Sequence, residues 1–216
     1  MNHVCCALRM AVAAALMFAM SAHEAMAQMR PSKPGAGYTP PAAAVGGGIV
    51  RIRDLTGAGP RGLLRSPEFT VSVSRGRVPA RDWAEILVTF DSEPEWIDEL
   101  SVQYYALLYS RLTKEYTLLK GIVSHTDVAR GRAHLSAGYV RPNTLLRYGD
   151  VVAVAVEMLS KGEVVGTQTE GKLPDRQALP VEWWKNAKIV PKDGYILNRT
   201  QTPFACINYD DYEVTK

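Results

Sequence analysis

Residues 100–108 read LSVQYYALL and residues 151–156 read VVAVAV. In the first stretch every second residue, beginning with Leu100, would share one face of an extended chain. The second stretch is apolar at every position, which is typical of a strand buried on both faces. These two stretches therefore predict β-strands at the centre of a hydrophobic core.

Short stretches of the same character lie on both sides of these two. They include ILVTF at 86–90, the alternation of Phe69, Val71 and Val73, and residues 49–53, 116–123, 133–140 and 163–167. Residues that favour turns separate them, at 75–77, 91–94, 120–121, 130–132, 141–143 and 148–150. Residues 160–163 predict a tight hairpin turn in which Gly162 supplies a positive φ. Because no long stretch has helical periodicity, we expect an all-β sandwich, with a barrel of the oligonucleotide/oligosaccharide-binding type as the alternative.

The first 27 residues have the three parts of a secretory signal peptide. Arg9 precedes an uncharged apolar run of 11 residues at 10–20, and Ala25-Met26-Ala27 is a small-x-small cleavage signal. The run is shorter than the roughly 20 residues that a membrane-spanning helix needs, so an uncleaved anchor is the less favoured alternative. We expect cleavage between Ala27 and Gln28, a periplasmic, outer-surface or secreted location, and no transmembrane span in the mature chain.

The mature chain is expected to have three parts. Residues 28–66 form a Pro/Gly-rich basic leader, residues 67–172 the β-sandwich, and residues 173–216 a C-terminal extension packed on the sandwich. Residues 28–65 carry six basic residues and one acid, which gives a net charge of +5. The whole chain of 216 residues carries only +3, so the rest of the mature chain is mildly acidic. This weak overall basicity argues against a nucleic-acid partner.

No set of residues with the spacing of a catalytic or metal site is present. Cys206 is the single cysteine after position 27, and its apolar surroundings at 204–207 predict a buried, inert thiol and no intramolecular disulfide. His125 and His134 flank the expected turn at 130–132 and would face each other with Asp127, but zinc needs further ligands that nothing supplies. We therefore expect no enzyme activity, no cofactor and no metal.

Two groups of residues are candidates for an interaction surface. The charged group comprises the acids Asp91, Glu93 and Glu95, expected on a connecting loop, and the basic residues Arg51 and Arg53. The aromatic group is Trp183 and Trp184, in a segment expected to form one or two helical turns. Both indoles cannot easily point inward from one turn, so they either dock the extension or form an exposed contact. Trp83 and Trp96 are expected to close the two ends of the core.

Three stretches carry a resemblance to a known group of proteins. They are WAEILVTF at 83–90, WIDELSVQYY at 96–105 and KGEVVG at 161–166. The region that contains them, roughly 90 residues long, resembles exported bacterial β-sandwich proteins with an immunoglobulin-like fold. Those proteins are similar to ones that are encoded with type IV pilus-like assembly components. The resemblance implies an immunoglobulin-like β-sandwich and a non-enzymatic role in a pilus-like or envelope assembly, with envelope proteins or a second copy of the chain as partners. A carbohydrate-binding or adhesin module is the alternative.

Overall fold

The computed structural model of the chain describes residues 48–216, except 71–76, 175–176 and 187. The expected signal peptide and most of the expected leader lie outside these residues. The described residues all belong to one compact unit.

The described chain is built mainly of strands. In chain order the elements are β1 (Val50–Thr56), the 3-10 helix η1 (Gly59–Gly62), β2 (Leu63–Arg65), β3 (Phe69–Thr70), β4 (Arg77–Val78), β5 (Asp82–Tyr109), β6 (Tyr116–Val140), α1 (Pro142–Tyr148), β7 (Asp150–Ser160), β8 (Glu163–Gly171), the 3-10 helix η2 (Trp183–Lys185), β9 (Lys192–Asp193), β10 (Ile196–Asn198), and the 3-10 helices η3 (Arg199–Gln201) and η4 (Tyr209–Asp211).

Two of the strands are far longer than the sequence predicted. β5 has 28 residues and β6 has 25, so each contains two of the expected short strands. The turns predicted at 91–94 and 130–132 are therefore wrong. Instead the ladder between β5 and β6 continues past them, with register shifts between Phe90 and Ser92 and between Ser92 and Trp96. Such irregularities bend a strand without ending it, because the extra residues are taken up on one side of the pair.

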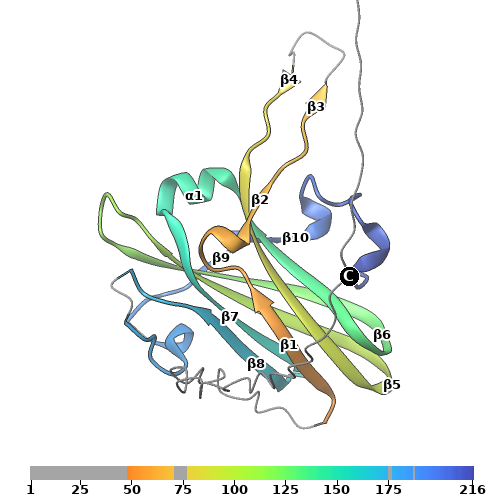
Figure 1. Cartoon of the computed structure of the whole chain (residues 1–216). Helices are drawn as coiled ribbons and strands as arrows, with labels where there is room; N and C mark the ends of the chain where they lie inside the picture. The colour runs from red at the N-terminus through yellow and green to blue at the C-terminus, as the bar shows by residue number, and fades with distance from the viewer. Residues whose placement is uncertain (1–47, 71–76, 175–176, 187) are drawn as a thin grey trace, which may run out of the picture. The chain divides into compact units, whose positions relative to one another are not determined.

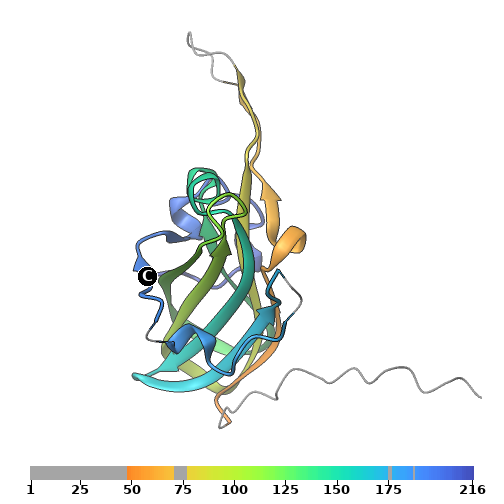
Figure 2. The ribbon, with the colours of Figure 1, turned by 90° about the vertical axis from the view of Figure 1, so that its left-hand side faces the viewer.

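The bend allows a single sheet to supply both layers of a sandwich. β6 lies along one side of β5, while β1 and β2 pair with the first half of β5 on its other side and β7 pairs with the second half (Figure 1). β8 follows on β7, and β9 and β10 pair with β6. Figure 2 shows the resulting sheet curled upon itself, with the paired strands β3 and β4 extending beyond it.

The main hydrophobic core fills the space between the two halves of this sheet. Ile86 and Val88 from the first half of β5 share one buried cluster with Leu100 and Val102 from the second half and with Val154 of β7. The residues that opened the sequence analysis are thus at the centre of the core. The prediction of an all-β, sandwich-like fold with a C-terminal segment packed on it is confirmed; the immunoglobulin-like connectivity stays a prediction.

The strands β1 and β8 lie against each other, and one side chain of β8 links it to the segment that follows β1. Glu170 accepts hydrogen bonds through Oε2 from the backbone N–H groups of Gly57 at 2.8 Å and Ala58 at 3.2 Å, and through Oε1 from Arg61 at 2.5 Å. Because the carboxylate satisfies backbone donors that follow β1, it closes the curled sheet at a place where no backbone ladder joins the edges.

Local turn chemistry explains two further features. Lys161 and Gly162 both have positive φ, at 52° and 83°, in the hairpin between β7 and β8, so the predicted tight turn is confirmed. The expected turn at 141–143 instead begins the helix α1, with Pro142 at its first position, where the missing N–H costs nothing. Within the described residues, no helix is long and apolar enough to span a membrane.

Candidate functional site

The charged residues of the candidate surface meet at the bend of β5. Arg51 stands opposite Asp91 in the ladder between β1 and β5. The Arg53 Nε donates to Asp91 Oδ2 at 2.6 Å, and the Asp91 Oδ1 accepts from the backbone N–H of Ala133 at 2.9 Å. The hydrogen bond from Arg53 is the main cause that lowers the pKa of Asp91 below its ordinary value. This pair of opposite charges is therefore satisfied within the chain.

Glu93 and Glu95, by contrast, leave their carboxylates in solvent. They lie within β5 and not on the connecting loop that the sequence predicted, because the strand continues through the bend. The Glu93 backbone is held on both sides: its N–H donates to Ile49 O at 3.0 Å and its carbonyl accepts from Arg130 Nε at 2.6 Å. These bonds thus fix the backbone position of Glu93.

A hollow of about 710 Å³ lies beside these acids, between the bend of β5 and the turn that joins β7 to β8. Trp96 is 61% exposed and Ile49 36% exposed at its wall. Its other lining residues are Pro94, Ile97, Asp98, Glu99, Ser101, Leu159, Ser160, Lys161, Gly162, Glu163 and Val165. We call this site the bend hollow.

Trp96 does not close an end of the core, so that expectation is wrong. Ile97 is 5% exposed and belongs to the main core, and the alternation of side chains along β5 places its neighbour Trp96 on the outside. Trp83 is buried, as expected, in a cluster with Tyr139 and Phe204. The sequence contained a signal for the exposure of Trp96, because this large indole lies within a run of acidic residues and has few apolar neighbours there to pack against.

Trp183 and Trp184 are both buried, at 6% and 5% exposure. Their rings are 5.7 Å apart and nearly perpendicular, so one indole covers the other, and the pair packs with Tyr105 and Ala155. The objection that both cannot point inward is therefore wrong, and the indoles are not an exposed contact. They dock the C-terminal extension, and the carbohydrate alternative loses the residues on which it rested.

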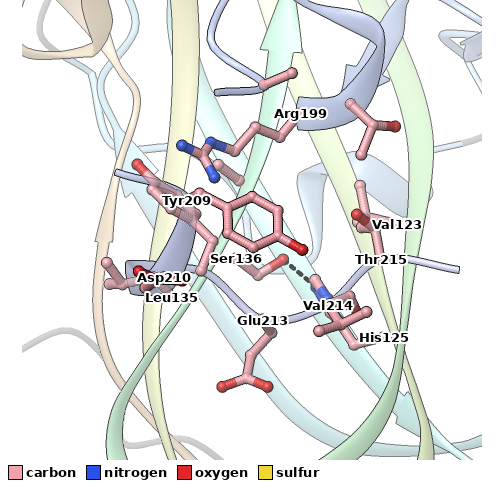
Figure 3. Close-up of a pocket in the computed structure, with 14 residues that line it drawn as sticks. Val123, His125, Leu135, Ser136, Arg199, Tyr209, Asp210, Glu213, Val214 and Thr215 are labelled. Atoms are coloured by element: carbon pink, nitrogen blue, oxygen red, sulfur yellow. Dashed lines mark hydrogen bonds between the residues drawn. The ribbon is translucent and has the colours of Figure 1, made fainter. Parts of the chain in front are cut away.

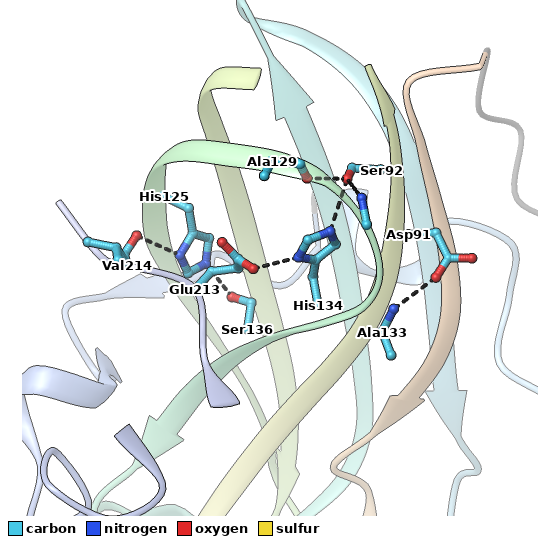
Figure 4. A network of polar contacts seen from close by, with 10 residues as sticks. Asp91, Ser92, His125, Ala129, Ala133, His134, Ser136, Glu213 and Val214 are labelled. Carbon is cyan, nitrogen blue, oxygen red and sulfur yellow. Dashed lines mark hydrogen bonds and ion pairs between the residues drawn. The ribbon is translucent and has the colours of Figure 1, made fainter. Parts of the chain in front are cut away.

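The two histidines hold the C-terminal end of the chain and not each other (Figure 4). His134 Nδ1 lies 2.5 Å from Glu213 Oε1, and His134 Nε2 lies 3.0 Å from Ser92 Oγ. Ser92 in turn donates to the Ala129 carbonyl at 2.6 Å and accepts from the Gly131 N–H at 2.9 Å. Ser92 thus ties the bend of β5 to the bend of β6, and neither its role nor its partners had a signal in the sequence.

His125 belongs to a second, more deeply buried chain of hydrogen bonds. Its Nδ1 donates to the Val214 carbonyl at 3.1 Å, which leaves Nε2 to accept from the Ser136 hydroxyl at 2.6 Å. The fully buried Tyr104 then donates to Ser136 Oγ at 2.6 Å. Among the described residues no group of three or more His, Cys, Asp and Glu is arranged to hold a metal ion.

We expect the burial of His125 to make the stability of the protein depend on pH. Burial is the main cause that lowers its pKa from 6.5, against the opposing effects of the Val214 carbonyl and of Glu213. The unfolded chain therefore takes up a proton that the folded chain resists. The stabilisation is complete above pH 6.5 and decreases as the pH falls below that value. Urea unfolding between pH 8 and pH 5 measures this, since one such group contributes up to about 1.4 kcal/mol per pH unit.

The variant His125→Gln is the control for this prediction. Gln keeps an amide that can replace the ring nitrogens but does not titrate in this range. Its stability should therefore vary less below pH 6.5 than that of the wild type. Equal pH slopes for the two proteins would show that His125 is not the group responsible.

Cys206 is exposed, which contradicts the expectation of a buried thiol. The apolar segment at 204–207 consists of successive turns, in which Ala205 N–H donates to Thr202 O and Ile207 N–H donates to Phe204 O. Phe204 is the residue of this segment that is buried, at 4% exposure.

Comparisons with known proteins agree with the fold. A crystal structure of a protein from Akkermansia muciniphila superimposes with a TM-score of 0.60 at 20% identity, covering 80% of this chain and 97% of that chain. At this identity the likeness shows a shared fold. A search of curated proteins finds no match. The model of one protein family matches residues 60–216, which takes in the long strands, α1 and the C-terminal extension. The chain therefore belongs to the family that this model defines.

Proposed function

We propose that the chain is an exported, non-enzymatic interaction module that binds other protein subunits of the cell envelope, in a pilus-like assembly, through the bend hollow. The observation that carries this proposal is Trp96, which is 61% exposed at the wall of a 710 Å³ hollow on a backbone fixed by strand pairing. Exposed aromatic residues beside a depression are typical anchors of protein interfaces.

The charges around the hollow indicate the charge that a partner segment should carry. Glu93 and Glu95 lie on the same bend, Asp98 and Glu99 line the hollow, and Glu163 faces them from β8. Lys161 is the basic residue among the lining residues. A partner segment that carries an apolar residue flanked by Lys or Arg would match this surface, and long-range attraction would speed the encounter.

The export and assembly parts of the proposal rest on the sequence. The signal-peptide pattern supports a periplasmic or outer-surface location, and the resemblance to immunoglobulin-like pilus-associated proteins supports the type of assembly. The non-enzymatic part also rests on the sequence, in which no set of residues has the spacing of a nucleophile, a base and an oxyanion site.

The test compares Trp96→Ala with Leu112→Ala in a quantitative capture from detergent-solubilised envelopes. Leu112 is 97% exposed and lies in the turn after β5, so its removal is a matched control for the loss of an exposed apolar side chain. We expect Trp96→Ala to weaken capture of the partner by about tenfold or more, as the loss of an interface anchor does. Leu112→Ala should bind as the wild type.

A second measurement checks the charge argument. Because the acids are exposed, capture should decrease when the salt concentration rises, and Glu95→Lys should weaken it further. If the wild type captures no envelope protein, or if Trp96→Ala captures as much as the wild type, the proposal is wrong. Sedimentation of the purified chain distinguishes a partner protein from a second copy of the chain.

A further inference from the structure

Arg199 is a buried cation without a counter-ion. It is 8% exposed, and its Nε has no hydrogen-bond partner. Among the described residues no ion pair or side-chain hydrogen bond involves its guanidinium. A buried charge normally requires a partner, because the loss of its hydration is costly unless an opposite charge or hydrogen bonds offset it.

The backbone places this arginine firmly. Arg199 is the first residue of η3, and Asn198 caps that turn by accepting from the Gln201 N–H at 3.1 Å. Thr202 Oγ1 donates to the Arg199 carbonyl at 2.7 Å. One face of the guanidinium rests on the Tyr212 ring, 4.0 Å from its centre. The contact holds the group by its face and leaves the N–H groups at its edge free for an acceptor.

Arg199 lines a cavity of about 300 Å³ between β6 and the C-terminal segment (Figure 3). Part of the wall is apolar, formed by Val123, Leu135, Ala137, Ala205 and Val214. The polar part includes His125 and Ser136, whose hydrogen bond to each other is drawn in Figure 3, and Tyr209. A cavity with an apolar wall and a few fixed polar groups is the usual form of a small-ligand site.

We propose that this cavity binds a monocarboxylate, with the carboxylate group on the edge of the Arg199 guanidinium and an apolar body against the wall. The planar, two-donor edge of arginine fits a carboxylate with two parallel hydrogen bonds. Asp210 and Glu213 also line the cavity, and their charges disfavour a ligand with two negative charges, such as phosphate. The carboxylate can come from the C-terminus of a peptide or from a small free acid.

The experiment uses the purified full chain and ligand-observed NMR at low salt. The probes are a short peptide with an apolar last residue and a free C-terminus, the same peptide amidated, and benzoate, each at concentrations up to about 10 mM to detect weak affinity. Binding of the free peptide but not of the amidated one or benzoate identifies a peptide terminus, and binding of benzoate identifies a small acid. If none of the probes binds, the proposal is wrong.

The decisive variant is Arg199→Met, which keeps an apolar stem against Tyr212 and removes the charge. We expect it to weaken carboxylate binding by about tenfold or more, since a charged hydrogen-bonding group is lost. We also expect it to unfold at the same or a higher temperature, because it no longer buries an unpaired charge. Arg147→Met is the matched control, because Arg147 also lies over a tyrosine, Tyr148, at 5.0 Å but outside the cavity.

The two readouts separate a binding role from a structural one. If Arg199→Met binds the carboxylate as well as the wild type and Arg147→Met do, the proposal is overturned. If Arg199→Met unfolds at a clearly lower temperature, the arginine stabilises the fold. The missing hydrogen-bond partner of its guanidinium then has another explanation, which also counts against the proposal. The proposal does not depend on the bend hollow, which is lined by different residues.

Discussion

Replacing Trp184 by alanine is expected to lower the free energy of unfolding by about 3–5 kcal/mol, the usual cost of removing a buried large aromatic side chain. Trp184 is 5% exposed and packs with Trp183 and with Tyr105, whose ring centre lies 6.3 Å away. Its Nε1 also donates to Glu157 Oε1 at 3.0 Å. Urea denaturation followed by circular dichroism measures the change.

The Glu157 carboxylate adds to this loss. It is 5% exposed and accepts from Trp184, from the Tyr105 hydroxyl at 3.2 Å and from Lys185 Nζ at 3.0 Å. Without the indole one partner of a buried charge is missing. Trp184→Phe keeps one aromatic ring in the site but removes this hydrogen bond and part of the packing, so it should cost less than Trp184→Ala, about 1–3 kcal/mol.

Trp96→Ala is the matched control, because it removes the same side chain from an exposed site. It should change stability by no more than about 0.5 kcal/mol. If Trp184→Ala were as mild as Trp96→Ala, the C-terminal extension would not be docked through this residue. If Trp96→Ala were as costly as Trp184→Ala, Trp96 would be part of the core and the bend hollow would lose its anchor.

The sequence predicted the core well because strand alternation depends only on local spacing. Leu100, Val102 and Tyr104 are all fully buried, on the face that period two assigned to them. The hairpin turn at Gly162 was predictable for the same reason, since a positive φ is a local demand. Predictions that rest on strand alternation or on the backbone conformation of a single residue were therefore confirmed.

The bend of β5 and β6 was not predictable because it depends on contacts between distant residues. Asp91-Ser92-Glu93-Pro94 reads as a turn, yet Ser92 bonds to Ala129, Gly131 and His134, which lie 37 to 42 residues later. Only when these partners are in place does a sequence rich in turn residues continue as a bulged strand.

The candidate site was predicted in part, for a related reason. Asp91, Arg51 and Arg53 do meet, but Arg53 and Asp91 neutralise each other within the chain. Cys206 was assigned the opposite exposure from the one it has, and for Trp183 and Trp184 the sequence left docking and an exposed contact open. Which residues of the C-terminal extension are buried depends on the surface that the extension covers, and the local sequence does not indicate that surface. Arg199 likewise carries no signal in the sequence, because the absence of a partner becomes visible only in the fold.

Replacing Gly149 by alanine is expected to lower the free energy of unfolding by about 2–5 kcal/mol, from a strained backbone and from steric overlap. Gly149 caps the end of α1, where its N–H donates to the Leu145 carbonyl at 2.8 Å, and its φ is 95°. A side chain there would be strained, at a cost of about 1–3 kcal/mol, because φ 95° with ψ −160° is a conformation that essentially only glycine adopts. A Cβ would also lie 2.1 Å from the Tyr109 carbonyl oxygen and 2.7 Å from Ser110 Cα. These atoms are backbone at the end of β5, so they cannot move aside as a flexible side chain would. Thermal and urea unfolding measure the total.

Gly162→Ala separates the two contributions to the Gly149 result. Gly162 also has a positive φ, at 83°, but a Cβ there would meet no atom within 4 Å. Its replacement therefore carries the backbone strain alone and should cost about 1–2 kcal/mol. The larger loss at Gly149 combines its more restricted backbone conformation with the cost of forcing α1 away from the turn that joins β5 and β6. Equal losses at both positions would mean that α1 can move without cost. A larger loss at Gly149 means that the close approach of α1 to β5 fixes the point at which the chain leaves β6 and enters β7. The same contact then fixes the register of β7, which pairs with the second half of β5.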